Sequence, residues 1–204
     1  MCSALANAFS EDPLTKAMNL TNEDISMMYE IPIRLGLRYG KVYATSENLE
    51  GIITFTPGKY ATMNLWNILW SGAIIPALKL RKKVGKLMRD MGKLLEEDKK
   101  NLNIGPFIYL FVIGVVQESQ GKGFGGKMLR ALIEKAENEG KSIYLETETE
   151  ENVRLYKKFG FEILKKIKIP ELNLPMWEMV RYYNHPNITT KELINQKLIK
   201  KENE

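Results

Sequence analysis

The segment 115-VVQESQGKGFGG-126 joins the strongest predicted strand of the chain to a strongly amphipathic stretch. The run before it, FIYLFVIGV at 107–115, is rich in β-branched and aromatic residues, which indicates a central strand. The apolar residues after it recur at helical spacing: Met128, Leu129, Leu132, Ile133 and Ala136. We therefore predict a strand, a glycine-rich turn and a helix in this order.

The glycines of this turn suit the binding of an anion. Unpaired N–H groups and a partial positive charge at a helix N-terminus attract phosphate. Gly121, Gly123, Gly125 and Gly126 permit positive φ angles and a close approach of the backbone, and Lys122 adds a cation at the rim. The spacing matches neither the dinucleotide fingerprint nor a Walker loop. A diphosphate-bearing ligand is the favoured interpretation, and a plain tight turn is the alternative.

Three segments resemble signatures of the GCN5-related N-acetyltransferase (GNAT) family. Residues 120–125, QGKGFG, resemble its pyrophosphate-binding Q/R-x-x-G-x-G/A motif. Residues 145–162, LETETEENVRLYKKFGFE, resemble its second signature, a strand and a short helix ending in Tyr-x-x-x-Gly-Phe. The closing PMWEMVR at 175–181 is similar to a variant found in small-molecule members. The resemblance covers about residues 107–182.

The resemblance implies an α/β (α+β) fold, with a mixed, mostly antiparallel twisted sheet flanked by helices. We expect one domain over residues 1–186, with its cofactor-binding core at 107–182. A helical acceptor-side segment, 62–100, would be inserted before the cofactor-binding strand, and a polar tail, 187–204, would follow. Family members usually open with a strand, whereas residues 1–39 look helical and a hairpin follows at 41–56. The sheet is thus either one strand short or rearranged at its start.

The resemblance also implies acetyl-coenzyme A as co-substrate. Main-chain groups of the glycine-rich turn would hold its pyrophosphate, and the strand before the turn would hold the pantetheine arm. The Val115 N–H would polarise the thioester carbonyl. Many relatives carry the cofactor-binding asparagine where this chain has Thr149. The residues expected to bind the cofactor are Ile113, Gly114, Val115, Gln120, Gly121, Lys122, Gly123, Phe124, Gly125, Gly126, Asn152 and Tyr156.

Three residues are the candidates for catalysis. Tyr156 matches the family's general-acid tyrosine, and the alternative is a core aromatic. In some relatives the Glu of a Leu-Glu strand end is the base, so the resemblance makes Glu146 the first candidate for the base and Glu148 the second. Residues two apart on a strand point to one side, so both carboxyl groups are expected to lie together. Surface carboxylates are the alternative for both. The only thiol, Cys2, has nothing near it in sequence that would lower its pKa, so we expect direct attack by the amine.

In the helical segment 62–100, apolar residues recur at three- and four-residue steps and predict one buried face: Leu80, Val84, Leu87, Met88, Met91, Leu94 and Leu95. Gly72, Pro76 and Gly85 are expected to break the segment into two or three pieces. Tyr60, Met63, Trp66 and Trp70 would either line an apolar acceptor pocket or belong to the core. Residues 79–100 hold nine Lys and Arg against four Asp and Glu, a net charge of +5. A solvated helix face is the favoured interpretation, and contact with phosphate groups, anionic lipid or nucleic acid is the alternative.

These observations predict an N-acetyltransferase that acts on a primary amine of a small molecule or a peptide. A non-catalytic acyl-coenzyme A sensor is the alternative, and a nucleic-acid binder ranks last. One cysteine and one histidine, His185, exclude a structural zinc site. No secretory signal is visible, and the apolar stretch 63–80 is too short to cross a bilayer. We therefore expect a cytoplasmic protein without nucleic-acid or membrane partners. A homodimer and a monomer both remain open.

Overall fold

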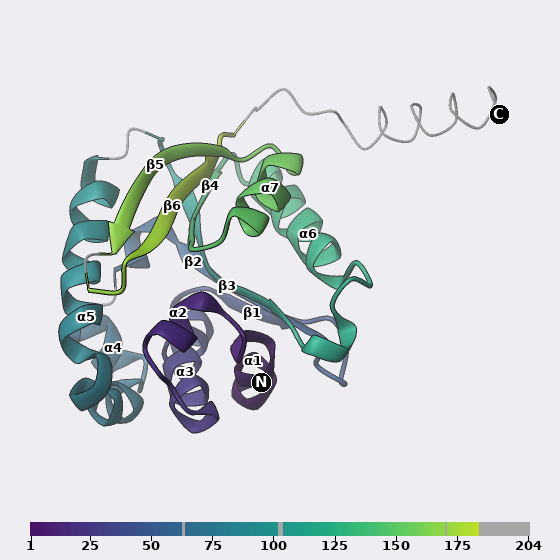
Figure 1. The fold of residues 1–204 in the computed structure, drawn as a ribbon. Coiled ribbons are helices and arrows are strands. Elements are labelled where there is room, and N and C mark those ends of the chain that lie inside the picture. Colours follow the sequence, from purple (N-terminus) through teal and green to yellow (C-terminus); the bar gives the residue numbers. More distant parts are fainter. Residues whose placement is uncertain (63, 102–103, 170, 184–204) are drawn as a thin grey trace, which may run out of the picture.

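The described residues form a sheet of six strands in the order β1-β2-β3-β4-β6-β5 (Figure 1). The structure is a computed structural model, and it describes residues 1–62, 64–101, 104–169 and 171–183. The strands are β1 (Lys41–Ala44), β2 (Gly51–Pro57), β3 (Phe107–Val115), β4 (Ser142–Thr147), β5 (Glu162–Ile169) and β6 (Leu174–Arg181). Every pair of neighbours is antiparallel except β3 and β4, which are parallel. This confirms the predicted mixed, mostly antiparallel sheet flanked by helices.

One face of the sheet is covered by α6 (Phe124–Asn138) and α7 (Glu150–Lys158) (Figure 1). The apolar stripe of α6, with Leu129 and Leu132 buried, packs in one core cluster with β3 and β4. The strand, glycine-rich turn and helix therefore follow one another as predicted.

The other face is covered by α1 (Cys2–Phe9), α2 (Pro13–Ala17), α3 (Asn22–Tyr39) and α5 (Ile74–Asn101). Helix α4 (Leu65–Trp70) packs on α3 and α5. The segment 62–100 breaks at Gly72, whose φ of 75° suits glycine. The breaks predicted at Pro76 and Gly85 do not occur. Pro76 lies in the first turn of α5, where its missing N–H is no loss, and Gly85 continues the helix.

The chain starts with helix rather than with the strand typical of the family. Among the described residues no strand precedes α1, and β1 forms the edge of the sheet. Helix α1 packs onto β3, where a Cβ on Gly114 would lie 2.8 Å from Leu5 and Phe9. Glycine at 114 therefore allows this close approach.

The central parallel pair separates after three residues. Phe107, Ile108 and Tyr109 of β3 pair with Ser142, Ile143 and Tyr144 of β4, and there the pairing ends. Strand β3 continues against β2 and β4 continues against β6. A β-bulge in β3 follows, because Thr54 and Phe55 oppose Val112 and Leu110 and skip Phe111. The two strands thus leave a wedge between them, and the candidate site is built around it.

Candidate active site

Backbone groups of β3 face the wedge at alternate residues. The Val116 N–H donates to the Glu50 carbonyl oxygen at 2.9 Å. Because hydrogen bonding alternates along an antiparallel pair, Gly114 also turns its backbone groups to β2. Ile113 and Val115 turn theirs away from β2, toward the side where β4 has separated. The Gly114 backbone thus bonds to β2, whereas the backbone groups of Ile113 and Val115 remain available on the side of the wedge.

The glycine-rich turn presents open main-chain amides. Gly121 and Gly123 have φ angles of 75° and 85°, and a Cβ on either would meet nothing within 4 Å. Gly123 is the N-cap of α6 and supplies no side-chain cap, so the first-turn amides of 124–126 have no partner within the helix. The Gln120 side chain donates to the Val115 carbonyl oxygen at 3.1 Å and ties the turn to β3. This cradle fits a diphosphate group.

The remaining predicted residues of this turn lie around the same cradle. Lys122 is exposed, whereas Phe124, Gly125 and Gly126 are half-buried. None of the residues 120–126 lines the large cavity described next. The predicted site therefore has two parts, a surface cradle and an interior cavity, and the wedge lies between them.

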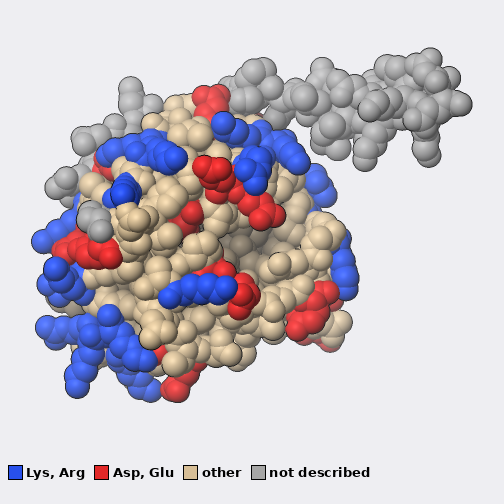
Figure 2. All heavy atoms as spheres, viewed as in Figure 1, with Lys and Arg blue, Asp and Glu red and all other residues tan. Residues whose placement is uncertain are grey.

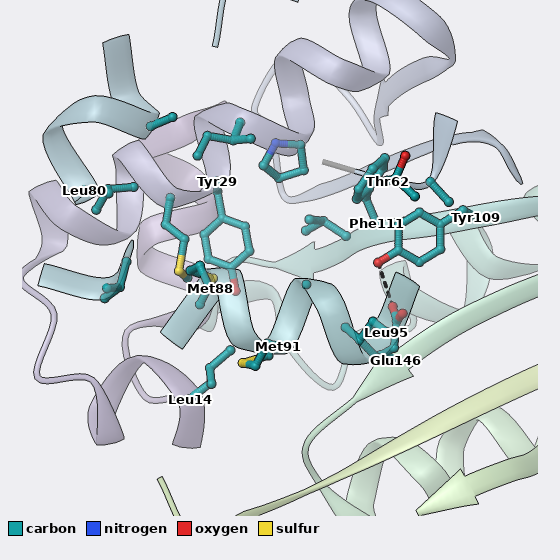
Figure 3. A pocket seen from close by; sticks show the side chains of 18 of the residues that line it. Leu14, Tyr29, Thr62, Leu80, Met88, Met91, Leu95, Tyr109, Phe111 and Glu146 are labelled. Atoms are coloured by element: carbon teal, nitrogen blue, oxygen red, sulfur yellow. Dashed lines mark hydrogen bonds between the residues drawn. The ribbon is translucent and has the colours of Figure 1, made fainter. Parts of the chain in front are cut away.

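A cavity of about 840 Å³ lies between the wedge and the helices α2 to α5 (Figure 3). Four predicted residues from β4, the turn after it and α7 line it: Glu146, Glu148, Asn152 and Tyr156. Most of the other lining side chains are apolar and come from α3, α4 and α5, and Figure 3 shows Leu80, Met88 and Met91 among them. The fold thus brings the predicted acid and both predicted bases to one cavity.

Glu146 is held by two partners. The Tyr109 hydroxyl donates to Glu146 Oε2 at 2.7 Å, the dashed line in Figure 3. Lys99 Nζ lies 2.9 Å from Oε1 and forms an ion pair with it, although the angles do not meet those of a hydrogen bond. Both side chains are nearly buried. The same ammonium group lies 4.0 Å from the centre of the Tyr109 ring. Protonating Glu146 would break a buried ion pair, which disfavours it as the base.

Glu148 has the surroundings of a group that exchanges protons near neutral pH. It follows the last paired residue of β4 and is half-buried at the cavity. Burial raises its pKa to about 8, with a further contribution from the carboxylates of Asp12 and Glu146. A general base works best when its pKa lies near the operating pH, so the geometry favours Glu148 over Glu146.

Tyr156 belongs to the core and to the cavity at once. Its ring is 6% exposed and lies 5.5 Å from the Phe161 ring. Burial, and then the charge of Glu148, raise the pKa of its phenol above the ordinary value of 10.0. Within the described ranges no residue hydrogen-bonds to its hydroxyl. The phenol therefore stays protonated and has a proton to donate.

Asn152 and its neighbour Thr149 form the start of α7. The Asn152 N–H donates to Thr149 Oγ1 at 3.1 Å, so Thr149 is the N-cap of this helix. Thr149 thus has a capping role at the position where many relatives carry the cofactor-binding asparagine. The side chain of Asn152 lines the cavity.

Four further residues of the site were not predicted. Asp12 caps α2 by accepting from the Leu14 N–H, and burial raises its pKa. Burial and the charges of Asp12 and Glu148 raise the pKa of Tyr29. Lys99 and Tyr109 hold Glu146. None of these contacts has a local signal in the sequence.

A second buried carboxyl group, that of Glu178, lies on β6 directly opposite Glu146. Glu178 accepts from the Tyr144 hydroxyl at 2.7 Å, and burial raises its pKa to about 7. Asp98 pairs with Lys165 at 2.6 Å. Together with Lys99, these contacts fix the C-terminal half of α5 on the sheet.

The predicted aromatic lining of an acceptor pocket is wrong for the tryptophans. Trp66 and Trp70 neither line the cavity nor belong to the core, because α4 turns them toward solvent. Tyr60 stacks on Tyr39 with ring centres 4.5 Å apart. Met63, His185 and the tail 187–204 lie outside the described residues.

No group of His, Cys, Asp and Glu within the described ranges could hold a metal ion. No helix in the same ranges is both long and apolar enough to cross a bilayer. Cys2 is half-buried, and burial raises the pKa of its thiol, which makes it a weak nucleophile.

Comparisons with known proteins agree with this architecture. Residues 91–161 match the model of the acetyltransferase (GNAT) family. A histone acetyltransferase HPA2 and related acetyltransferase from Corynebacterium glutamicum is 19% identical, with a TM-score of 0.58 and 91% of each chain covered. Arylalkylamine N-acetyltransferase 2 from Aedes aegypti is 16% identical, with a TM-score of 0.60 and 90% of this chain and 93% of that chain covered. At such identities the likeness concerns the fold.

Proposed function

Because this chain has the GNAT fold and carries the acetyltransferase (GNAT) domain at residues 91–161, we propose that it moves an acetyl group from acetyl-coenzyme A to an amine. The acceptor would be a primary amine on an apolar body. One observation carries the proposal: a buried acid, Tyr156, and a carboxyl with a pKa of about 8, Glu148, line one largely apolar cavity beside the wedge.

The cofactor would be held by main-chain groups. The amides of the glycine-rich turn, residues 120–126, would bind its pyrophosphate, because Gly121 and Gly123 leave open the space a Cβ would fill. The backbone of Ile113 and Val115 would bind the pantetheine arm, and the Val115 N–H would face the thioester carbonyl. Acetyl-coenzyme A supplies an acetyl group activated as a thioester. Gly114 is left out of this set because its backbone faces β2.

Proton transfer would divide between two side chains. The acceptor enters as an ammonium ion and gives a proton to the Glu148 carboxylate. The amine nitrogen then forms the C–N bond as the C–S bond breaks, and the Tyr156 hydroxyl gives its proton to the departing sulfur. The second proton that the nitrogen loses on becoming an amide restores the Tyr156 hydroxyl, and Glu148 releases its proton to solvent. Attack is direct, since the thiol of Cys2 is held protonated by burial. Glu146 would remain paired with Lys99 and would take no part in the proton transfer.

The cavity supports an acceptor with two unlike ends. The carboxyl groups of Glu148, just after β4, and of Asp12, the N-cap of α2, line the cavity and would attract an ammonium group. Apolar side chains, among them Leu14 of α2 and Met91 of α5, line most of the remainder (Figure 3). Burial of apolar surface stabilises a bound alkyl or aryl body at about 25 cal/mol per Å². A polyamine or an aminoglycoside would leave charges unpaired there.

Release of free thiol from acetyl-coenzyme A tests the proposal. An acceptor panel should contain alkylamines and arylalkylamines of rising length, together with polyamines, aminoglycosides, amino acids and peptide N-termini. We expect kcat/KM to rise with the apolar area of the amine. Glu148→Gln should lower turnover by about tenfold to a thousandfold, whereas the exposed Glu151→Gln should not. Tight acetyl-coenzyme A binding without thiol release for any amine would instead favour a sensor.

A further inference from the structure

Helix α4 and the first turn of α5 expose a cluster of large apolar side chains. Six side chains are well exposed: Leu65 at 68%, Trp66 at 66%, Leu69 at 47%, Trp70 at 65%, Ile75 at 63% and Leu78 at 56%. They come from fourteen consecutive positions, 65–78, whereas such residues are scattered singly elsewhere in the described ranges. A concentration of exposed apolar side chains of this size marks an interaction surface.

Basic residues continue this surface along α5. The exposed Lys79, Lys82, Lys86 and Arg89 follow one another at steps of three and four residues, so they share one face of the helix. The opposite face holds Leu80 and is buried. Figure 2 shows Lys and Arg gathered at the lower left, where α5 begins in Figure 1. No Asp or Glu occurs from residue 65 to residue 89.

The apolar cluster borders the cavity. Leu65 of α4 and Leu78 of α5 are both exposed and both line the cavity, so they lie on its rim. Arg81, the next exposed residue along α5 that lines the cavity, places a cation at the same rim. The cavity therefore opens where tryptophan and basic side chains meet solvent.

We propose that this α4–α5 surface, residues 65–89, docks on an anionic phospholipid bilayer. Tryptophan and leucine on one side with Lys and Arg beside them are the composition of helices that lie in the membrane interface. Tryptophan rings favour the headgroup level, and each basic residue near the surface is attracted by anionic lipid. The surface would lie on the bilayer, since none of the described helices can span it. Charge alone predicted a solvated helix face without a membrane partner, and the outward tryptophans change that prediction.

Two other occupants fit less well. A nucleic acid would use the Lys and Arg but would leave Leu65, Leu69, Ile75 and Leu78 without an apolar partner. A second copy of the chain would bring the same basic surface against itself in a two-fold dimer, and like charges would repel. An anionic bilayer satisfies the apolar and the basic side chains together.

The proposal stands apart from the proposed function but has a consequence for it. A lipophilic amine partitions into a bilayer, and the rim formed by Leu65 and Leu78 would lie at the bilayer surface. An acceptor dissolved there would enter the cavity without crossing bulk water.

Vesicle binding by the full chain tests the proposal. Vesicles of phosphatidylcholine alone are compared with vesicles of equal parts phosphatidylcholine and phosphatidylglycerol, by flotation and by tryptophan emission. Two of the three tryptophans, Trp66 and Trp70, lie on the surface, while Trp177 is buried. We expect binding at least about tenfold tighter to the anionic vesicles, a blue shift of emission, and weakening by salt.

Paired variants separate the surface from the rest of the molecule. The tryptophan variant combines Trp66→Ser with Trp70→Ser, and the lysine variant combines Lys82→Glu with Lys86→Glu. Each of these two variants should weaken vesicle binding at least about tenfold. The matched control, Leu155→Ser with Lys157→Glu on the exposed face of α7, should bind as the natural chain does. Unchanged circular dichroism establishes that each variant is folded.

Three results would overturn the proposal. The first is equal, weak binding to both kinds of vesicle. The second is that the chain binds no vesicles but binds a duplex RNA probe, and that the tryptophan variant still binds this RNA. The third is that the chain binds no vesicles but associates with itself in solution, and that the tryptophan variant no longer does so. Loss of thiol release without loss of vesicle binding would bear on the proposed function alone.

Discussion

Replacing Glu148 by Gln should make the protein more stable in alkaline solution and less active. The Glu148 carboxyl has a pKa of about 8 in the folded chain, against an ordinary value of 4.5. Burial is the main cause, and the charges of Asp12 and Glu146 add to it. A glutamine fills the same space without taking on charge. The substitution therefore removes the cost of ionising this group inside the fold.

The size and sign of the effect follow from proton linkage. Below about pH 4.5 Glu148 is protonated in both states, so it costs nothing. Between about pH 4.5 and pH 8 the unfolded chain releases the proton while the folded chain keeps it, so the free energy of unfolding falls as pH rises. Above about pH 8 both states are ionised and the full cost applies. A pKa difference of about 3.5 corresponds to about 5 kcal/mol as an upper limit, and we expect at least about 2 kcal/mol because the carboxyl adjoins an open cavity.

Urea unfolding of both proteins from about pH 4 to about pH 9 measures this difference. The stability gained by Glu148→Gln should be near zero at the acid end, rise through neutral pH and level off above about pH 8. Glu151→Gln is the matched control, because its exposed side chain is solvated in both states. A gain that stays constant across the pH range would refute the reasoning, since it would show that Glu148 is not held protonated by the fold.

Three further substitutions test the site. Tyr156→Phe should lower kcat about tenfold to a hundredfold in the thiol-release assay with little effect on stability, and full turnover at every pH would contradict the acid role. Lys99→Met should cost about 3 to 5 kcal/mol in urea unfolding, because Glu146 is left buried without its cation. The double variant with Glu146→Gln should recover most of that loss, and no recovery would mean that the ion pair is not the cause. Gly123→Ala should cost about 1 to 2 kcal/mol at its φ of 85° and raise the KM for acetyl-coenzyme A, whereas an unchanged KM would remove the turn from the cofactor site.

The parts of the fold that the sequence predicted are those with local causes. Alternating and β-branched residues predicted the hairpin of β1 and β2 and the strand β3. Glycines that need positive φ predicted the turn before α6, and the apolar period of α5 predicted its buried face. The interruptions predicted inside α5 were wrong because a proline in the first turn of a helix costs little, and because Gly85 is tolerated in a helix packed along its length.

The placement of the tryptophans could not be predicted from composition. Large aromatic residues are buried on average, which favoured a pocket or the core for Trp66 and Trp70. Helix α4 is six residues long and turns Ile68 toward the cavity, so the side chains on its other faces point outward. Their exposure follows from how α4 packs on α3 and α5, and that packing is set by residues far away in the chain.

The two candidate bases show most clearly what sequence reasoning leaves open. Glu146 and Glu148 lie two residues apart, and the strand period correctly predicted one side for both. Their difference comes from what surrounds each carboxyl group. Lys99, contributed by the far end of α5, neutralises Glu146, while Glu148 lies beyond the last paired residue of β4 and has carboxylates as its charged neighbours. Different surroundings are the usual basis for assigning different roles to two carboxyl groups. Because Lys99 pairs with Glu146, we propose Glu148 as the base.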